Sequence, residues 1–508
     1  MTATPAEPLL CGVDVGTSQI RALVFTPAGR VVASAAEPTP MQVAGPDRAE
    51  LDAEGLWRAV LSVLRGAVAG VPRPHAIRGL AVASVGEAGV LVGDDGRALA
   101  PIVAWYDTRT TQELERLLAA VEFEQLHRVT GLCPDPTFSL PKLMWHKRQT
   151  ADAFAAARHW LNLADYLAWR LCGERATDLG LASRTLLLDL ERRAWAVPLL
   201  DAFEIPGSLL APIVPAGTSL GRLRPEVAAL AGLPPDCVVG VGGHDHVCGL
   251  LAAGADAPGV LLDNMGTAEA LSFVREAPLA DPALGWDGFN QGVFHVDRPL
   301  YYVFGGLPTA AAAVEWFRGL HDGADHAALI AEAEAAPWGC DGVLFLPHLR
   351  LGSPPFPDPV GRGAFLGLSA ATSRGALFRA LLEGIAMDGA NILKAMLPHL
   401  GPGVPKRILA IGGITRNELL MRLKATAYGA PVAVLELPDT TCLGAALLGG
   451  LAAGVFTSLD DARSRIDVPA RVVPPEADRG GPRRLERQAV YAAAYAALRP
   501  LHARLLDG

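Results

Sequence analysis

Two similar turns in this sequence combine the residue types that bind a phosphate and a metal ion. The first is Asp14-Val15-Gly16-Thr17-Ser18, which lies between two short apolar runs and therefore predicts a β-hairpin. Gly16 lets the backbone approach a ligand closely, and the amides and hydroxyls of Thr17 and Ser18 can face an anion. Asp14 ends the first strand and could hold a cation. The turn therefore indicates a magnesium-bound phosphate, with an ordinary hairpin turn as the alternative.

The second turn lies about half a chain further on. Residues 260–269 repeat the order of apolar strand, acid or amide, Gly266-Thr267 and a small residue. Two copies of one turn suggest two domains of one design that face each other across a nucleotide. The recurrence favours the phosphate-binding interpretation over an ordinary hairpin.

Other chemistry-bearing side chains follow predicted strands. Glu87 is the one acid in a loop after a buried strand, Trp105 and Asp107 open a helix, and Asp245 lies in a Gly-Gly turn. His244 and His246 flank Asp245 and suggest a His-Asp-His metal site. Such near neighbours seldom converge on one ion without further ligands, so hydrogen bonding to a substrate or to the loop is the favoured interpretation.

Composition limits the class of protein. The chain has 508 residues, of which 51% are hydrophobic and 19% charged, which predicts a globular protein of two or more domains. Its net charge of −9 argues against a nucleic-acid or anionic-membrane partner. The seven cysteines are scattered with no Cys-x-x-Cys pair, and the N-terminus has no signal-peptide pattern. These features predict a cytoplasmic protein with reduced thiols.

Predicted strands and helices alternate along the chain, which indicates the α/β class. Asp52 is expected to cap a helix that ends near Val68, and a long helix is expected from about residue 372 to 397. Residues 468–483 are rich in proline and glycine and are interpreted as a linker. A last amphipathic helix is expected over residues 485–506.

Taken together, the motifs resemble the FGGY carbohydrate kinase family, within the actin, hexokinase and Hsp70 superfamily. The resemblance covers about residues 9–454, and one departure is Ala376, where the family usually has a polar residue. It rests on these segments in order: Asp14-Val15-Gly16-Thr17-Ser18-x-x-Arg21; Trp105-x-Asp107-x-Arg109; Ser139-x-x-Lys142-Leu143-x-Trp145; Thr177-Asp178 with Ala182-Ser183-x-Thr185; Gly242-Gly243-x-Asp245; Gly266-Thr267-Ala268; Gly363-x-Phe365-x-Gly367-Leu368, then Glu383-Gly384; and Gly412-Gly413-x-x-x-Asn417.

The resemblance implies two ribonuclease-H-like domains that close on ATP, magnesium and a sugar. We place the sugar-binding domain, with the catalytic base, at residues 1–254 and the nucleotide-binding domain at 255–508, with the linker and last helix from about 468. By analogy, Asp245 is the general base, and Asp14 with Asp245 binds the metal. The phosphate and nucleotide contacts that the resemblance implies are Gly16, Thr17, Ser18, Arg21, Gly266, Thr267, Gly412, Gly413 and Asn417.

Positions of the sugar site differ from the glycerol kinases of the family. Those enzymes carry Arg-Glu where this chain has Gly86-Glu87, a Tyr at Thr137 and a Phe at Ala270. The smaller side chains at these positions predict an acceptor larger than glycerol: a ketopentose or ketohexose, such as xylulose or ribulose, or a sugar alcohol. The expected substrate contacts are Glu87, Trp105, Asp107, Asp245, His246 and Glu269, although Trp105 could instead be a core residue.

The expected activity is therefore ATP-dependent transfer of a phosphoryl group to an alcohol. Two rival functions are a catalytically inactive sugar and nucleotide sensor of the same fold, and an actin- or Hsp70-like ATPase that acts on protein partners. A sensor should have lost the base or the phosphate turns, and all of them are present. The oligomeric state stays open, with a homodimer as one option.

Overall fold

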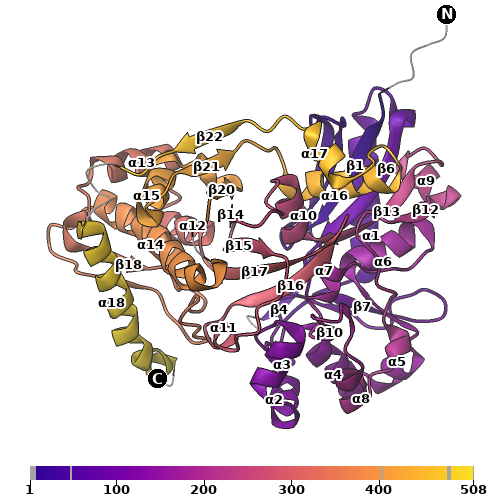
Figure 1. Cartoon of the computed structure of the whole chain (residues 1–508), viewed down its shortest axis with the longest axis horizontal. Coiled ribbons are helices and arrows are strands. Elements are labelled where there is room, and N and C mark those ends of the chain that lie inside the picture. Colours follow the sequence, from indigo (N-terminus) through magenta and orange to yellow (C-terminus); the bar gives the residue numbers. More distant parts are fainter. Residues whose placement is uncertain (1–6, 46–47, 402, 404, 477–481, 507–508) are drawn as a thin grey trace, which may run out of the picture.

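A computed structural model describes residues 7–45, 48–401, 403, 405–476 and 482–506. Figure 1 shows two lobes side by side, the N-terminal lobe in indigo and magenta and the C-terminal lobe mostly in orange. Each lobe is built on a mixed β-sheet with helices packed against it. The predicted α/β class with two domains is confirmed.

The N-terminal sheet has six strands in the order β12-β13-β6-β1-β2-β3. β1 pairs antiparallel with β2, which forms the predicted hairpin, and it pairs parallel with β6. One face of the sheet is covered by α1, α6 and α9. The bounds are β1 (Leu9–Val15), β2 (Gln19–Phe25), β3 (Val31–Pro38), β6 (Ile77–Ser84), β12 (Ser219–Arg222), β13 (Val238–His244), α1 (Ala53–Ala69), α6 (Leu163–Cys172) and α9 (Pro225–Ala231).

The C-terminal sheet repeats this local design with seven strands in the order β16-β17-β15-β14-β20-β21-β22. β14 and β15 form the second predicted hairpin, and β14 pairs parallel with β20. The carboxyl ends of parallel strands lie at one edge of a sheet, so the Gly-Thr turn and the end of β20 are neighbours. The bounds are β14 (Val260–Met265), β15 (Glu269–Arg275), β16 (Asn290–His295), β17 (Pro299–Leu307), β20 (Arg407–Ile411), β21 (Val432–Leu435) and β22 (Ala470–Val473).

Two helices join the lobes by packing against the opposite sheet. α16 (Thr440–Ala452) follows β21 of the C-terminal sheet but lies on β1, β6 and β13. α10 (Asp245–Ala252) follows β13 and packs with apolar residues of the C-terminal sheet. Glycines permit backbone contact here, because a Cβ on Gly12 would lie 1.8 Å from the Cys442 carbonyl oxygen. The packing therefore departs from a simple division of the chain at residue 254.

A helical insertion between β6 and β12 extends the N-terminal lobe below its sheet, where Figure 1 labels α2, α3, α4, α5 and α8. It contacts the C-terminal sheet, since the Ser183 hydroxyl accepts from the Val293 amide at 2.9 Å. The insertion thus ties β16 to the N-terminal lobe. Its elements are β7 (Gly89–Val92), β8 (Ile102–Val103), α2 (Thr111–Ala120), α3 (Phe123–Thr130), α4 (Ser139–Gln149), α5 (Ala151–Ala156), β9 (His159–Asn162), α7 (Leu179–Ala182), β10 (Leu188–Asp189), β11 (Ala194–Trp195) and α8 (Val197–Ala202). The short strand β5 (Arg48–Leu51) pairs with β8 on one side and with β4 (Met41–Gly45) on the other.

Helices cover the outer part of the C-terminal lobe. The long helix α14 begins after Ser373, whose hydroxyl accepts from the Ala376 amide at 3.1 Å. The predicted linker is partly wrong, because β22 pairs with β21 at the sheet edge, and residues 477–481 lie outside the described chain. The remaining elements are α11 (Ala283–Trp286), α12 (Ala311–Gly319), α13 (His326–Ala335), β18 (Leu344–Leu346), β19 (Ala364–Leu366), α14 (Arg374–Leu400), α15 (Glu418–Tyr428), α17 (Leu459–Ser464) and α18 (Pro482–Leu506).

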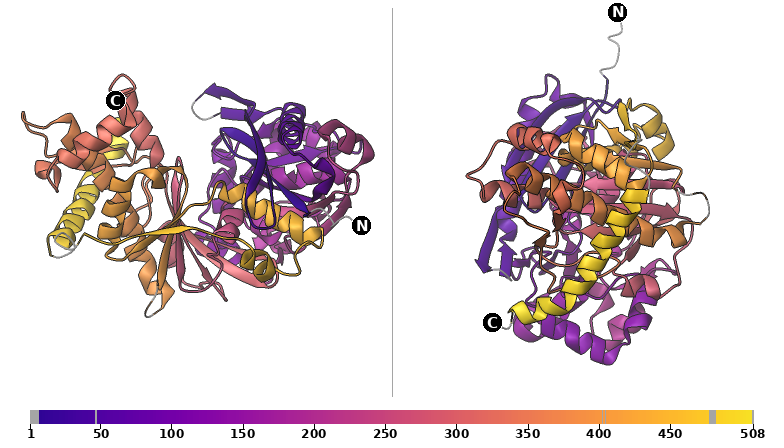
Figure 2. Two further views of the ribbon diagram at one scale, coloured as in Figure 1. Left: turned by 90° about the horizontal axis from the view of Figure 1, so that it is seen from above. Right: turned by 90° about the vertical axis from the view of Figure 1, so that its left-hand side faces the viewer.

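The two yellow parts of the chain, α16 with α17 and the final α18, lie on different lobes (Figures 1 and 2). α18 packs along α14, where the Tyr491 hydroxyl donates to Asp388 at 2.9 Å. Within the described residues, no helix is long and apolar enough to cross a membrane.

Candidate active site between the lobes

The first hairpin places Asp14 and Arg21 opposite each other in the register of β1 and β2. Arg21 Nη2 donates to Asp14 Oδ2 at 2.5 Å, and Arg21 Nη1 lies 2.8 Å from Asp439 Oδ2. Asp439 also caps the start of α16 by accepting from the Cys442 amide. Arg21 thus joins the hairpin to a segment of the other half of the chain. The resemblance implies that Arg21 contacts a phosphate, and in the structure its guanidinium is shared by two carboxylates.

The electrostatic setting of Asp14 fits a cation. Its pKa is raised to about 7, chiefly because the carboxyl is buried, and the negative charges of Asp245 and Asp439 add to this against the opposing effect of Arg21. Asp14 Oδ1 is buried and has no hydrogen-bond partner among the described residues. An unpartnered carboxylate oxygen beside other carboxylates is a suitable position for a divalent cation.

Asp245 begins α10 directly after β13, so the strand end fixes its backbone. Its Oδ1 accepts from the His246 amide at 2.6 Å and lies 3.1 Å from His244 Nε2. Burial lowers the pKa of His244 well below its usual value, and the charges of His246 and Arg184 add to this effect. Burial also raises the pKa of Asp245, whose side chain keeps 24% exposure. A partly exposed carboxylate with a raised pKa suits a general base.

The second turn is linked to the same place. Asn264, at the end of β14, lies with its amide nitrogen 3.3 Å from His246 Nδ1, the neighbour of Asp245. Gly266 and Thr267 follow, with carbonyls that accept from the amides at the start of α12. The two turns therefore approach Asp245 from opposite lobes, because Val15 and His244 both lie opposite Ser84 of β6 and His246 contacts Asn264.

The glycine amides of the two turns have partners inside the turns. Gly16 donates to the Gln19 carbonyl at 3.1 Å, and Gly266 donates to the Ala268 carbonyl at 2.8 Å. In the described chain, the amides of Thr17 and Ser18 donate to no protein group. These two amides are therefore the ones that can face a phosphate.

The expected nucleotide contacts Gly412, Gly413 and Asn417 lie beside the second turn. Gly412 has φ of +105°, and a Cβ there would lie 2.1 Å from the Met265 carbonyl oxygen, so only glycine fits. A Cβ on Gly413 would meet no atom within 4 Å, which leaves room for a flat ligand. Asn417 caps α15 by accepting from the Leu420 amide at 3.0 Å. Its side-chain oxygen thus has a structural role.

Two of the predicted sugar contacts lie in the N-terminal lobe near the first turn. Trp105 Nε1 donates to Thr17 Oγ1 at 2.7 Å, so Trp105 lies against the phosphate turn rather than inside the core. Glu87 pairs with Arg184 at 2.6 Å. The buried ammonium of Lys142 donates to the Glu87 carbonyl at 2.6 Å and fixes the loop that carries Glu87.

The prediction that Asp107 contacts the substrate is wrong for this structure. Its side chain is fully buried, and its two oxygens accept from the Arg109 side chain and the Ala49 amide. Both oxygens are used, so Asp107 fixes the backbone after Trp105 and has no free acceptor for a sugar.

The predicted sugar contact of Glu269 is also wrong. Glu269 is fully buried in the C-terminal lobe, where it accepts from Lys424, which also donates to Asp263 at 3.0 Å. Glu269 and Asp263 lie on the two strands of the second hairpin, so Lys424 stabilises the hairpin that carries Gly266. The carboxylate faces the core, not the junction of the lobes.

Two residues of the site were missed by sequence reasoning. Arg184 falls at the variable position of the Ala182–Thr185 motif, and Phe304 lies in a strand with no polar signal. Arg184 lies between the rings of Phe138 and Phe304, at 5.2 and 5.0 Å from their centroids. No local pattern in the sequence links these segments, because they meet only in the folded protein.

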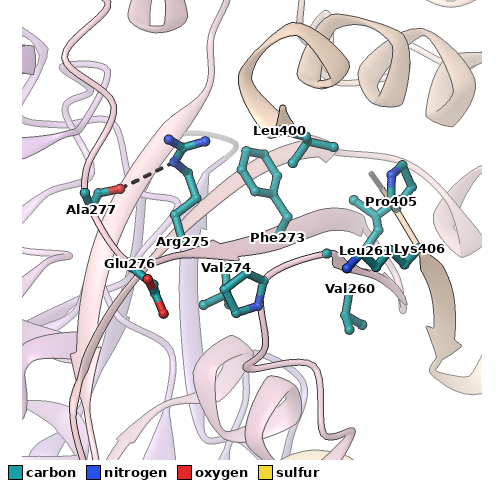
Figure 3. Close-up of a pocket in the computed structure, with 12 residues that line it drawn as sticks. Val260, Leu261, Phe273, Val274, Arg275, Glu276, Ala277, Leu400, Pro405 and Lys406 are labelled. Carbon is teal, nitrogen blue, oxygen red and sulfur yellow. Dashed lines mark hydrogen bonds between the residues drawn. The ribbon is translucent and has the colours of Figure 1, made fainter. Parts of the chain in front are cut away.

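A pocket elsewhere in the C-terminal lobe is not part of this site. Figure 3 shows it at the start of β14, with Arg275, Phe273 and Leu400 around it, and its volume is about 510 Å³. The Gly-Thr turn lies at the other end of β14, roughly 16 Å away at about 3.3 Å per residue. The chemistry-bearing residues therefore lie away from this pocket.

Known proteins share this arrangement over most of the chain. Residues 9–252 match the N-terminal domain model, and residues 261–453 match the C-terminal domain model, of the FGGY family of carbohydrate kinases. The chain belongs to the FGGY family of carbohydrate kinases. This FGGY kinase is 32% identical over 476 residues to glycerol kinase of Bordetella parapertussis, with 90% of this chain and 91% of that one covered.

Two further FGGY relatives carry other names. L-fuculokinase of Escherichia coli K12 is 29% identical over 476 residues, which cover 93% of this chain and 98% of that protein. The crystal structure of xylulose kinase from Rhodospirillum rubrum superposes with a TM-score of 0.86 at 29% identity, over 97% of this chain and 100% of that one. The FGGY kinase described here is therefore an ATP-dependent phosphotransferase with an alcohol acceptor and the actin-like two-domain fold of its family.

Proposed function

We propose that this FGGY kinase transfers the γ-phosphoryl group of ATP to a hydroxyl of a ketose, such as xylulose or ribulose, or of a sugar alcohol. The observation that carries the proposal is the position of Asp245. Its neighbour His244 lies opposite Ser84 of β6, as does Val15 of the first turn, and its other neighbour His246 contacts Asn264 beside the second turn. A base between two phosphate turns is the arrangement that in-line phosphoryl transfer requires.

In the proposed mechanism, Asp245 accepts the proton of the attacking hydroxyl, and His244 Nε2 lies 3.1 Å from its Oδ1. The amides of Thr17 and Ser18 and the turn at Thr267 hold the phosphates from opposite lobes. Phosphoryl transfer has a loose transition state, so positioning and charge stabilisation matter more than the strength of the base.

The carboxylate of Asp14, with Asp245, would hold Mg²⁺, which when bound neutralises the phosphate charge. The described residues form no group of three or more His, Cys, Asp or Glu side chains that could enclose a metal by themselves. This pattern fits Mg²⁺, which usually keeps waters and phosphate oxygens as ligands beside one or two carboxylates. Asp14 Oδ1, buried and without a partner, is the oxygen offered to it.

The choice of acceptor rests on the family relatives and on the lining residues. Relatives of comparable similarity are named glycerol kinase, L-fuculokinase and xylulose kinase. The predicted gain of space at Gly86 needs correction, because the Arg184 side chain fills it: a Cβ on Gly86 would lie 2.5 Å from Arg184 Cγ. Half-buried Thr137 keeps its smaller side chain beside Phe138, and this supports an acceptor longer than glycerol.

The proposal is tested by Asp245→Asn. We expect phosphoryl transfer to fall by about 10²- to 10⁴-fold, as is typical for the loss of a general base, with ATP binding unchanged. Asp236→Asn, which alters an exposed ion pair with Arg78, is the control and should keep full activity. The assay is ADP release with purified protein and a panel of ketoses and sugar alcohols, combined with calorimetric ATP binding. Near-normal turnover by Asp245→Asn would contradict the role of Asp245, and sugar binding without turnover would favour the sensor.

A further inference from the structure

The end of strand β14 presents an amide side chain that the proposed mechanism does not use. Successive side chains of a strand face opposite sides of its sheet, and Asp263 faces the interior of the C-terminal lobe, where Lys424 donates to it at 3.0 Å. Asn264 therefore faces the other way, toward α10. A Cβ on Gly249 of α10 would lie 3.9 Å from Asn264 Nδ2, so the amide lies directly against the helix that begins with Asp245.

The Asn264 side chain forms one hydrogen bond within the described chain, and its partner is His246. Asn264 Nδ2 lies 3.3 Å from His246 Nδ1. The His246 ring is also stacked with Phe304 of β17, with centroids 6.3 Å apart and planes 17° apart. Two residues of the C-terminal sheet thus hold the ring of a residue that adjoins Asp245, the proposed base.

The other ring nitrogen of His246 is available to a ligand. The side chain is exposed, and no described residue forms a hydrogen bond with its Nε2. An imidazole that is held at one nitrogen presents the other nitrogen in a fixed direction. His246 follows Asp245 directly, so Nε2 can form a hydrogen bond with a second hydroxyl of the acceptor whose first hydroxyl Asp245 deprotonates.

The same strand end carries the second phosphate turn. Asn264 is followed by Met265, Gly266 and Thr267, and the carbonyls of Gly266 and Thr267 accept from amides at the start of α12. A nucleotide phosphate bound at this turn would restrain the strand end, and with it the Asn264 side chain. A segment that one ligand has already ordered costs less to order when a second ligand binds. Binding at the turn is therefore expected to favour binding at His246.

We propose that Asn264 is a positioning residue that couples the two substrate sites: it holds the His246 ring for the acceptor, and nucleotide binding at the adjacent turn strengthens that hold. The inference rests on the proposed function, because it needs an acceptor at His246 and a nucleotide phosphate at Thr267. Coupling between two binding sites is reciprocal, so the acceptor raises the affinity for the nucleotide by the same factor.

The test measures acceptor binding by calorimetry, with and without the non-hydrolysable analogue β,γ-imido-ATP and MgCl2. The probes are D-xylulose, D-ribulose and xylitol. For wild type we expect the analogue to lower the acceptor Kd by about fivefold or more. For Asn264→Ala the analogue should change the acceptor Kd by about twofold or less, while the Kd of the analogue measured without acceptor stays as in wild type.

Two further variants distinguish positioning from a purely structural role. Asn264→Leu keeps the volume of the side chain without its amide, and it should lose the coupling even if Asn264→Ala fails to fold in thermal melting. His246→Ala should also lose the coupling, and adding Asn264→Ala to it should cause no further loss, because the two side chains act as one unit. A purely structural Asn264 would instead lower the melting temperature, and its effect would add to that of His246→Ala.

Asn290→Ala is the matched control. Asn290 begins β16 and is half-buried, as Asn264 is. Its side chain also bonds between the lobes, since Oδ1 accepts from the Cys133 amide at 2.9 Å, but this partner belongs to the helical insertion rather than to α10. Asn290→Ala should therefore keep the wild-type coupling factor.

The outcomes separate this inference from the proposed function. If the analogue leaves the acceptor Kd of wild type unchanged, or if Asn264→Ala keeps the wild-type coupling, the positioning role of Asn264 is overturned while the kinase activity, measured by ADP release, stands. If wild type neither binds nor phosphorylates any of the three probes, the proposed function fails and the inference fails with it.

Discussion

The buried ammonium of Lys424 leads to a stability prediction that the structure makes quantitative. Lys424 and both carboxyls that it contacts, Asp263 and Glu269, are fully buried. The Tyr428 hydroxyl donates to Asp263 at 2.6 Å, and a Cβ on Gly389 would lie 2.9 Å from the ammonium, so the space is filled. One cation thus faces two carboxyls inside the lobe that carries the second Gly-Thr turn.

The charges of this cluster balance if Glu269 carries a proton. Burial raises the pKa of Glu269 from 4.5 to about 8, with Asp263 adding to the shift and Lys424 opposing it. The nearby carboxylates raise the pKa of Lys424 against the effect of burial, so the ammonium stays charged. Lys424→Met therefore leaves a buried carboxylate without its partner, which costs about 3–5 kcal/mol. Glu269→Gln replaces a neutral group by a neutral one and should cost about 1 kcal/mol or less.

The assay is urea unfolding at pH 7 with ATP absent. Lys394→Met, on the exposed side of α14, is the lysine control and should change the free energy of unfolding by about 0.5 kcal/mol or less. Lys424→Met combined with Asp263→Asn should recover part of the loss, because the second change removes the unpaired charge. Equal destabilisation by Glu269→Gln and Lys424→Met would refute the proposed charge balance.

The same cluster sets a pH dependence with a definite sign. Between pH 4.5 and about 8, folded Glu269 is protonated and unfolded Glu269 is ionised, so the folded state binds more protons. The contribution of Glu269 to the free energy of unfolding therefore falls as pH rises through this range. Asp14 shifts in the same direction, so the quantity to measure is the difference between wild type and Glu269→Gln. Relative to wild type, Glu269→Gln should become more stable from pH 5 to pH 8.

Two further predictions concern the nucleotide and acceptor sides of the site. Gly412→Ala places a Cβ 2.1 Å from the Met265 carbonyl oxygen at φ of +105°. We therefore expect about 1–3 kcal/mol of destabilisation, measured by thermal melting, and a raised ATP KM, measured by initial rates. An unchanged melting temperature and an unchanged ATP KM would show that this crowding has no effect. Trp105→Phe removes the hydrogen bond to Thr17 at 2.7 Å, so kcat/KM should fall up to about tenfold without loss of stability. An unaltered kcat/KM would show that this contact has no part in turnover.

The local features of the fold could be predicted from the sequence. The Asp14 and Gly266 turns, the helix that begins after Asp52 and the alternation of strands with helices all follow from constraints that act within a few residues. Glycine turns and apolar periodicity depend only on residues that are close together in the sequence. The family motifs also predicted the order of these elements. The match to the family and the sheet topology confirm the α/β class with two lobes.

The burial and pairing of the polar side chains were decided only by the tertiary structure. Asp107 and Glu269 carry carboxyls that look available in the sequence, yet partners in the fold use them, and the partner of Glu269 lies 155 residues away. Arg184 reaches Glu87 across 97 residues because Gly86 leaves room for its stem. A carboxylate is free or engaged according to what the fold brings within about 3 Å of it, and local sequence does not contain that information.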